Sequence, residues 1–112
     1  MSDSFLSELR VANVLRVPDF NTGPINNWSP AERGNELAGE VGELCNELKK
    51  LLRYQKGGKH PGDDYQQRIK EELADVIICA DLIGAQLEID IEEAVRFKFN
   101  KTSDKVGSKV KL

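Results

Sequence analysis

Long apolar runs are missing from this sequence, and so is the pattern of a secretory leader. No stretch approaches the ~18 consecutive apolar residues that a membrane-spanning helix requires. The first ten residues, MSDSFLSELR, lack the basic segment followed by an apolar segment that marks a signal peptide. We therefore expect a cytoplasmic protein that has no membrane partner.

Histidine and cysteine are scarce. The one histidine, His60, lies in a glycine-rich segment, and the two cysteines, Cys45 and Cys79, lie within apolar helical patterns. A di-iron site in a helical bundle needs a Glu-x-x-His pair on each of two helices, so a single histidine argues against that class. Two cysteines in such patterns are typical of buried free thiols in a reducing compartment.

An excess of basic residues is also absent. The formal net charge is −3, with 39% hydrophobic and 31% charged residues, which is ordinary for a globular domain. Because nucleic-acid-binding domains usually carry a basic face, we expect no nucleic-acid partner. The length of 112 residues suits one domain over 1–112, with a core at about 28–101 and a basic, mobile tail at about 102–112.

What the sequence does contain is helical periodicity. Apolar residues recur every three or four positions in four segments, at about 4–16, 29–53, 64–87 and 90–101. Ser29, Pro30 and Glu32 predict a capping box at the start of the second segment, and QKGGKHPGDD ends it. LEIDIE and VRFKFN alternate as strands do, but we interpret both as incidental. The prediction is an all-α fold in which two long antiparallel helices are covered by two shorter ones.

The apolar faces predict how these helices pack. The first segment places Phe5, Leu9, Ala12 and Leu15 along one face. The two long segments carry broad apolar arcs that need more partners than one small chain offers. We therefore expect a homodimer or homotetramer in which helical subunits together form a four-helix bundle.

Acidic residues in the two long segments form the most informative pattern. In the second segment four glutamates at steps of four, three and four share one face beside the apolar stripe: Glu36, Glu40, Glu43 and Glu47. In the third segment Glu72 and Asp75 flank the apolar stripe, whereas Asp81 and Glu71 are expected to be solvated charges. If the two helices meet along their stripes, Glu40 and Glu43 face Glu72 and Asp75 across the seam.

Spacing alone is weak evidence for a site. Nineteen acidic residues in 112 give about three acid-x-x-acid pairs by chance. The pairs in the second and third segments lie inside long helices, beside apolar stripes and small residues such as Gly39 and Gly42. Glycine within a helix costs up to ~1 kcal/mol relative to alanine, which suggests that something approaches closely at this point. Solvated charge on a bundle surface is the alternative interpretation.

A divalent cation would explain why the carboxylates converge. Carboxylates that share a partly buried site raise one another's pKa values, and a cation relieves that repulsion. A ligand set made only of oxygen favours Mg²⁺, with Mn²⁺ as a substitute. Because Mg²⁺ held by few carboxylates keeps positions for water and substrate phosphates, the pattern indicates chemistry at a phosphate ester or anhydride.

The segments WSPAERGNELAGEVGELCNELKK and EELADVIICADLIGAQLEIDIEEAVRFKFNKTSDKVGS resemble the MazG-like nucleoside triphosphate pyrophosphohydrolases of the short single-domain type. The family hallmark, Glu-x-x-Glu and then Glu-x-x-Asp, is matched by Glu40 with Glu43 and by Glu72 with Asp75. Many relatives carry a further glutamate directly before the first pair, where this chain has Gly39.

The resemblance implies a fold and an activity. It implies an all-α protein that assembles into four-helix bundles and hydrolyses (deoxy)nucleoside triphosphates to the monophosphate and pyrophosphate. It also implies dependence on Mg²⁺ and a role in nucleotide-pool house-cleaning. By this resemblance, the metal site and the catalytic site share four carboxylates: Glu40, Glu43, Glu72 and Asp75.

Further residues are candidates for substrate binding. The resemblance implies phosphate or base contacts near the start of the last segment, from Lys98, Asn100 and Lys101, against the alternative of a solvated basic tail. Trp28 either stacks on a nucleobase or packs on the stem of Arg33. Glu36 is an auxiliary candidate for the base or a second ion, and Glu47 is expected to be a surface or interface charge.

A second class of function fits the same sequence. The chain would then be a non-catalytic helical oligomerisation or partner-binding module, and its carboxylates would be surface charge. Nothing in the sequence selects the base or sugar of a nucleotide substrate.

Overall fold

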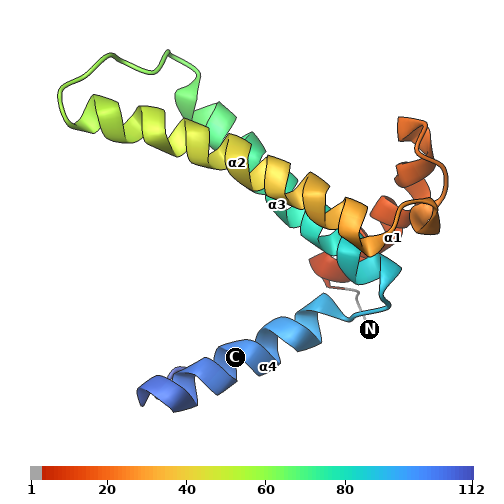
Figure 1. The fold of residues 1–112 in the computed structure, drawn as a ribbon. Coiled ribbons are helices and arrows are strands. Elements are labelled where there is room, and N and C mark those ends of the chain that lie inside the picture. The colour runs from red at the N-terminus through yellow and green to blue at the C-terminus, as the bar shows by residue number, and fades with distance from the viewer. Residues whose placement is uncertain (1–3) are drawn as a thin grey trace.

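The structure is a computed structural model that describes residues 4–112, and helices are its only secondary-structure elements over that range (Figure 1). Its elements are α1 (Phe5–Arg16), the 3₁₀ turns η1 (Val17–Phe20) and η2 (Ile25–Asn27), α2 (Pro30–Gln55), α3 (Tyr65–Gln86) and α4 (Ile91–Val106). No strand occurs in residues 4–112, which confirms the all-α prediction and the interpretation of LEIDIE and VRFKFN as incidental. Within the same range, none of the helices combines the length and apolar character needed to cross a membrane.

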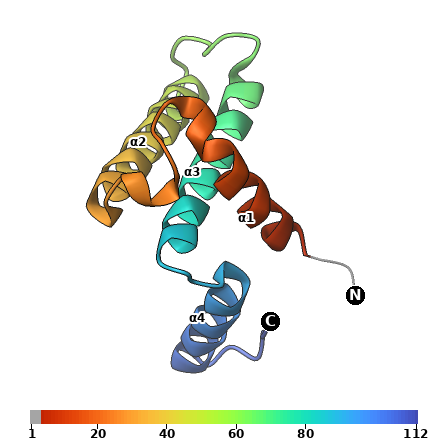
Figure 2. The ribbon, with the colours of Figure 1, turned by 90° about the vertical axis from the view of Figure 1, so that its right-hand side faces the viewer.

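The long helices α2 and α3 run antiparallel and side by side, as predicted (Figures 1 and 2). The predicted capping box starts α2: Glu32 N donates to Ser29 Oγ, and Ser29 N donates to Glu32 Oε1, each at 3.1 Å. At the other end Gly57 (φ 90°) and Gly62 (φ 106°) occupy positive-φ positions that only glycine adopts readily. Arg68 of α3 holds this loop by donating to Pro61 O at 2.6 Å and by pairing with Asp64.

Helix α1 packs on α3 through polar groups, so the predicted apolar face of α1 is wrong. Phe5 and Leu15 are 70% and 74% exposed. The buried contact is made instead by Asp81 of α3, which accepts from Arg10 Nε at 3.1 Å and from Asn13 Nδ2 at 3.0 Å. Asp81 is 3% exposed, so the expectation that it is solvated is also wrong. A carboxylate is stable in this position because two donors satisfy it.

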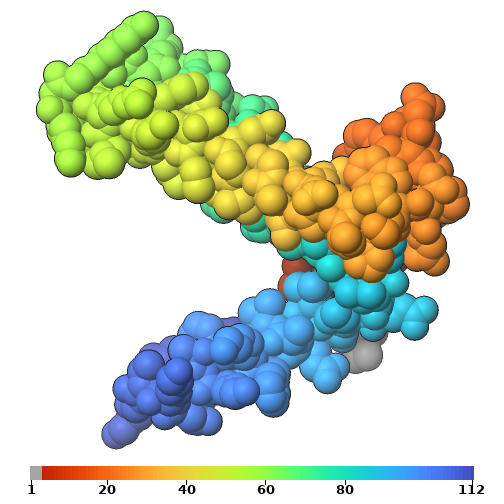
Figure 3. Space-filling model, viewed as in Figure 1, coloured from red at the N-terminus to blue at the C-terminus, as the bar shows by residue number. Residues whose placement is uncertain are grey.

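Helix α4 is longer than predicted and stands apart from the hairpin. The helix was expected to end near Lys101 but continues to Val106, where Gly107 (φ 76°) closes it in the left-handed conformation. The last residues then turn back along the helix, where Leu112 N donates to Asn100 Oδ1 at 2.8 Å. Figure 3 shows open space between α4 and the α2–α3 hairpin, which meet only near the α3–α4 junction.

The single chain buries few of its apolar side chains. Within residues 4–112 only Val17, Cys79 and Leu82 are buried hydrophobic residues. Cys79 is buried as expected, but Cys45 is exposed, which corrects that part of the prediction. The radius of gyration is 17.2 Å, against about 13 Å for a compact domain of 100 residues. The helices therefore form an open frame around the seam between α2 and α3.

Candidate active site

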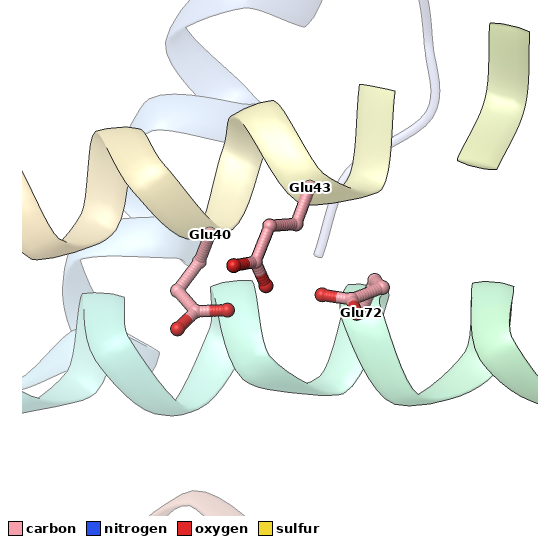
Figure 4. Close-up of side chains that lie close together, drawn as sticks. All are labelled: Glu40, Glu43 and Glu72. Atoms are coloured by element: carbon pink, nitrogen blue, oxygen red, sulfur yellow. The ribbon is translucent and has the colours of Figure 1, made fainter. Parts of the chain in front are cut away.

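Three glutamates meet at the seam between α2 and α3. Glu40 and Glu43 extend from α2 toward α3, and Glu72 lies opposite them on α3 (Figure 4). One oxygen from each of the three carboxylates lies within 4.8 Å of the other two. Antiparallel pairing brings the residues together, because the three-residue step from Glu40 to Glu43 keeps both on the face beside α3. The structure thus assembles three of the four carboxylates of the predicted site.

The fourth carboxylate, Asp75, lies one turn along α3 beside this cluster. Asp75 lines the same cavity as Glu40 and Glu36, and its negative charge contributes to raised pKa values at Glu40 and Glu72. It is not among the three residues whose oxygens lie within 4.8 Å of one another. The charge of Asp75 therefore affects the carboxylates of the cluster, and Asp75 lies on the side of the cluster that faces the cavity.

The electrostatics of the cluster are unfavourable for a protein without a ligand there. Burial raises the pKa of the Glu40 carboxyl, and the charges of Glu43, Asp75 and Glu36 raise it further. Burial likewise raises the pKa of Glu72, with Glu43 adding to the effect. Both causes disfavour the charged form of a carboxyl group.

The donor set fits a hard divalent cation. Glu40 Oε2 and Glu72 Oε2 are buried and accept no hydrogen bond within residues 4–112. A buried carboxylate oxygen without a partner costs free energy, and a cation would satisfy it. The ligands are all oxygen, which favours Mg²⁺ or Mn²⁺ over zinc or copper. The close approach expected at Gly39 and Gly42 is not made within residues 4–112, since a Cβ built on either exposed glycine would meet nothing within 4 Å.

A cavity of about 300 Å³ opens beside the cluster. Its walls come from α1 and η1 as well as from α2 and α3, and its polar lining includes Asn13, Arg33, Glu36, Glu40 and Asp75. The thiol of Cys79 also faces it, and burial together with the charges of Glu36 and Glu40 raises the pKa of this thiol to about 12. A thiol in that state is an inert part of the wall.

The sequence did not predict that α1 and Arg33 line this cavity. Arg33 was expected only as a packing partner of Trp28, and the structure does place the two in contact, with the guanidinium carbon 4.9 Å from the ring centroid. Trp28 lies outside the cavity lining, whereas Arg33 is 1% exposed and faces the cavity. Buried arginines are rare, so the sequence pattern gave no signal for this one.

The remaining predicted residues lie in two different environments. Glu36 lines the cavity, with its Oε1 3.9 Å from Arg33 Nη1. On α4, Lys98 and Lys101 are exposed, and the amide of Asn100 donates to Leu112 O at 3.2 Å. Because α4 stands away from the hairpin in Figure 1, the chain does not bring these three residues to its own carboxylates.

Comparison with known proteins identifies the family to which the helices that carry these carboxylates belong. The sequence matches the MazG nucleotide pyrophosphohydrolase domain over residues 29–107, which is most of the chain. The chain belongs to the MazG nucleotide pyrophosphohydrolase family. No curated protein and no solved structure matches it significantly. The MazG match contains α2, α3 and α4 with all four carboxylates, and it excludes α1, which provides one wall of the cavity.

Proposed function

We propose that this MazG domain hydrolyses nucleoside triphosphates to the monophosphate and pyrophosphate in a reaction that depends on Mg²⁺. The observation that carries the proposal is the cluster of Glu40, Glu43 and Glu72, each of which offers a carboxylate oxygen within 4.8 Å of the others. Glu40 and Glu72 each also have a buried oxygen that lacks a hydrogen-bond partner within residues 4–112. In a nucleotide pyrophosphohydrolase family, such a cluster beside a cavity is best explained as the site that receives the triphosphate.

The residues have separate tasks in this proposal. Glu40, Glu43 and Glu72 would hold Mg²⁺, with Asp75 at the edge of the same cluster. When bound, the cation neutralises phosphate charge and acidifies a coordinated water. A carboxylate oxygen that stays free of the cation accepts a proton or hydrogen bond from the water that attacks the α-phosphorus. The bond from that phosphorus to the bridging oxygen then breaks, and pyrophosphate leaves.

We also propose that the working protein is a homo-oligomer, a dimer or a tetramer. Apolar side chains on both hairpin helices are about half exposed: Val41, Leu48, Leu73 and Ile77. Helix α4 carries three candidate phosphate contacts: Lys98, Asn100 and Lys101. These residues reach the phosphates only if α4 of one copy lies beside the carboxylates of another copy. A site shared in this way would use the open space between α4 and the hairpin seen in Figure 3.

The test measures products from a panel of dNTPs with and without Mg²⁺. We expect pyrophosphate and the monophosphate from the wild type in Mg²⁺, and a loss of at least about 100-fold in Glu43→Gln, since removal of even an outer partner of a metal ligand costs 10- to 100-fold. The matched control is Glu71→Gln on the exposed side of α3, which should keep full activity.

Two results would contradict this function. Wild-type turnover in Glu43→Gln would remove that residue from the site, and release of orthophosphate instead of pyrophosphate would show that a different bond is cleaved. Absence of turnover on every nucleotide, together with no change in thermal stability on adding Mg²⁺ and a non-hydrolysable analogue, would favour a non-catalytic helical oligomerisation module.

A further inference from the structure

The end of the cavity farthest from Glu72 holds two buried polar atoms that have no hydrogen-bond partner within residues 4–112. They are Nε of Arg33 and Oε1 of Glu36, on consecutive turns of α2. Nη1 of Arg33 lies 3.9 Å from Glu36 Oε1, which is too long for a hydrogen bond. Arg33 and Glu36 thus form a long ion pair. Arg33 Nε and Glu36 Oε1 are nevertheless both desolvated, and neither has a hydrogen-bond partner within the described residues.

The guanidinium of Arg33 is held firmly by its other contacts. Nη2 donates to Ile25 O at 3.2 Å, and the ring of Trp28 lies against the guanidinium, 4.9 Å from its carbon. The backbone carbonyl of Trp28 in turn accepts from the side chain of Gln86 on α3. Arg33 is 1% exposed, and leaving a buried donor unpaired costs about 1–3 kcal/mol or more for a charged group. A fixed orientation and an unpaired donor are typical of a side chain that is preorganised to bind a ligand.

The position of this pair along α2 indicates which part of a nucleotide it meets. Arg33 precedes Glu40 by seven residues, which is about 10 Å along a helix axis. With the phosphates at the carboxylates, the nucleoside extends toward the N-terminus of α2, and its base arrives at Arg33 and Glu36. The cavity volume of about 300 Å³ is at the low end for ligand pockets, so it suits the nucleoside part alone.

We propose that Arg33 and Glu36 recognise the nucleobase, and that the base they select carries an exocyclic amino group beside a hydrogen-bond acceptor. This proposal rests on the proposed function and specifies its substrate class as triphosphates of cytosine, adenine or guanine. The amino group of the base donates a hydrogen bond to Glu36 Oε1, and the neighbouring acceptor of the base accepts a hydrogen bond from Arg33 Nε. Uracil and thymine offer instead a ring N–H between two carbonyl oxygens. If the N–H donates to Glu36 and one carbonyl accepts from Arg33 Nε, the second carbonyl lies against the carboxylate and repels it.

The walls of the cavity support this assignment. Val17 of η1 and Ile78 and Leu82 of α3 present apolar surface between α1 and the hairpin. Apolar walls with a few fixed polar groups are typical of a pocket that orients a flat aromatic ligand. Trp28 then acts as a positioning residue, because it touches Arg33 and does not line the cavity.

The experiment compares kcat/KM for dCTP, dATP and dGTP with kcat/KM for dUTP and dTTP. Glu36→Gln is near-isosteric and replaces a carboxylate oxygen with an amide that also donates. We expect it to lower kcat/KM by about 10- to 100-fold for the best amino-bearing substrate, while the values for dUTP and dTTP change less than about threefold. Arg33→Lys should reduce the same selectivity, and Arg53→Lys, an exposed arginine at the other end of α2, is the matched control.

Binding of non-hydrolysable analogues of the same five nucleotides, measured by calorimetry, separates this proposal from the proposed function. If the wild type binds the amino-bearing nucleotides selectively and Glu36→Gln abolishes that selectivity, Arg33 and Glu36 are supported as the recognition pair. This conclusion holds even if no pyrophosphate is released, because absence of pyrophosphate would overturn only the proposed hydrolase activity. Unchanged ratios among the five bases in Glu36→Gln overturn the recognition pair, although wild-type turnover would leave the hydrolase intact. Because Glu36→Gln adds no volume, the test does not depend on whether Arg33→Lys folds.

Discussion

Neighbouring glutamates on α2 differ in function because they differ in partners. Glu47 accepts from Arg68 Nε at 3.1 Å and from Lys50 Nζ at 3.2 Å, so its negative charge is already compensated. Glu40, two turns earlier, has a buried oxygen without a partner within residues 4–112, as does Glu72 across the seam. The column of glutamates in the sequence therefore divides into carboxylates that stabilise the hairpin and carboxylates that are available to a cation.

The pair between Glu47 and Arg68 should make stability depend on pH. The hydrogen bond from Arg68 holds the pKa of Glu47 below its usual value of 4.5. A carboxyl whose pKa is lower in the folded state contributes stability above its unfolded pKa and loses that contribution as the pH falls through the folded pKa. We expect Glu47→Gln to lower the midpoint of thermal unfolding at pH 7, and this difference from the wild type should shrink below about pH 4.5.

Glu71→Gln is the control for this measurement, since Glu71 is exposed and forms no ion pair within residues 4–112. Its unfolding midpoint should follow that of the wild type at every pH. A difference between Glu47→Gln and the wild type that persists unchanged at pH 3 would show that packing of the side chain, and not its charge, stabilises the hairpin.

The starts of the helices could be predicted from the sequence, because capping side chains determine them locally. The packing face of a helix was harder to predict, because it depends on tertiary contacts. Ser29 and Asp90 accept from backbone amides three residues on, and the starts of α2 and α4 were predicted correctly. The face of α1 was not, because its contact with α3 is made by Arg10 and Asn13, which carry no apolar periodicity.

The approach of Glu40 and Glu43 to Glu72 was expected from helical spacing combined with antiparallel pairing of the two long helices. The cavity was not expected, because it depends on α1, whose contact with α3 leaves no periodic pattern in the sequence.

Arg10 should be a main anchor of α1. Its Nε donates to the buried Asp81 at 3.1 Å and its Nη2 to Ile89 O at 2.8 Å, which ties α1 to α3 and to the α3–α4 turn. Arg10→Met leaves Asp81 with only its donor from Asn13. We expect the free energy of unfolding in urea to fall by about 2–3 kcal/mol, since a buried charge loses a partner.

Two further variants test the reason for that loss. Arg96→Met on α4 breaks an ion pair with Glu92 whose partners are 57% and 43% exposed, so its effect should be close to zero. Adding Asp81→Asn to Arg10→Met removes the unpaired charge and should recover part of the stability. If the double variant is as unstable as the sum of the single ones, the two side chains do not interact.

The molecule as a whole exposes more surface than a self-sufficient domain of its size. Its accessible area is 8213 Å², against about 6,200 Å² expected for a compact monomer of 12.5 kDa. The excess of about 2,000 Å² on one chain corresponds to about 4,000 Å² for a pair of chains, which is within the range of interfaces in obligate homodimers. The open frame and the half-exposed apolar residues of α2 and α3 have a common explanation if a second copy covers them.

This explanation predicts that assembly and folding are linked. The midpoint of thermal unfolding should rise with protein concentration, because a partner subunit binds only the folded chain. Leu48→Asp places a charge among the half-exposed apolar side chains of α2 and should yield monomers by light scattering, with a lower midpoint that no longer depends on concentration. Asn46→Asp introduces the same charge about 200° away around the helix and should leave assembly unchanged. A wild type that remains monomeric with a concentration-independent midpoint would refute assembly, and Lys98, Asn100 and Lys101 would then have no route to the carboxylates.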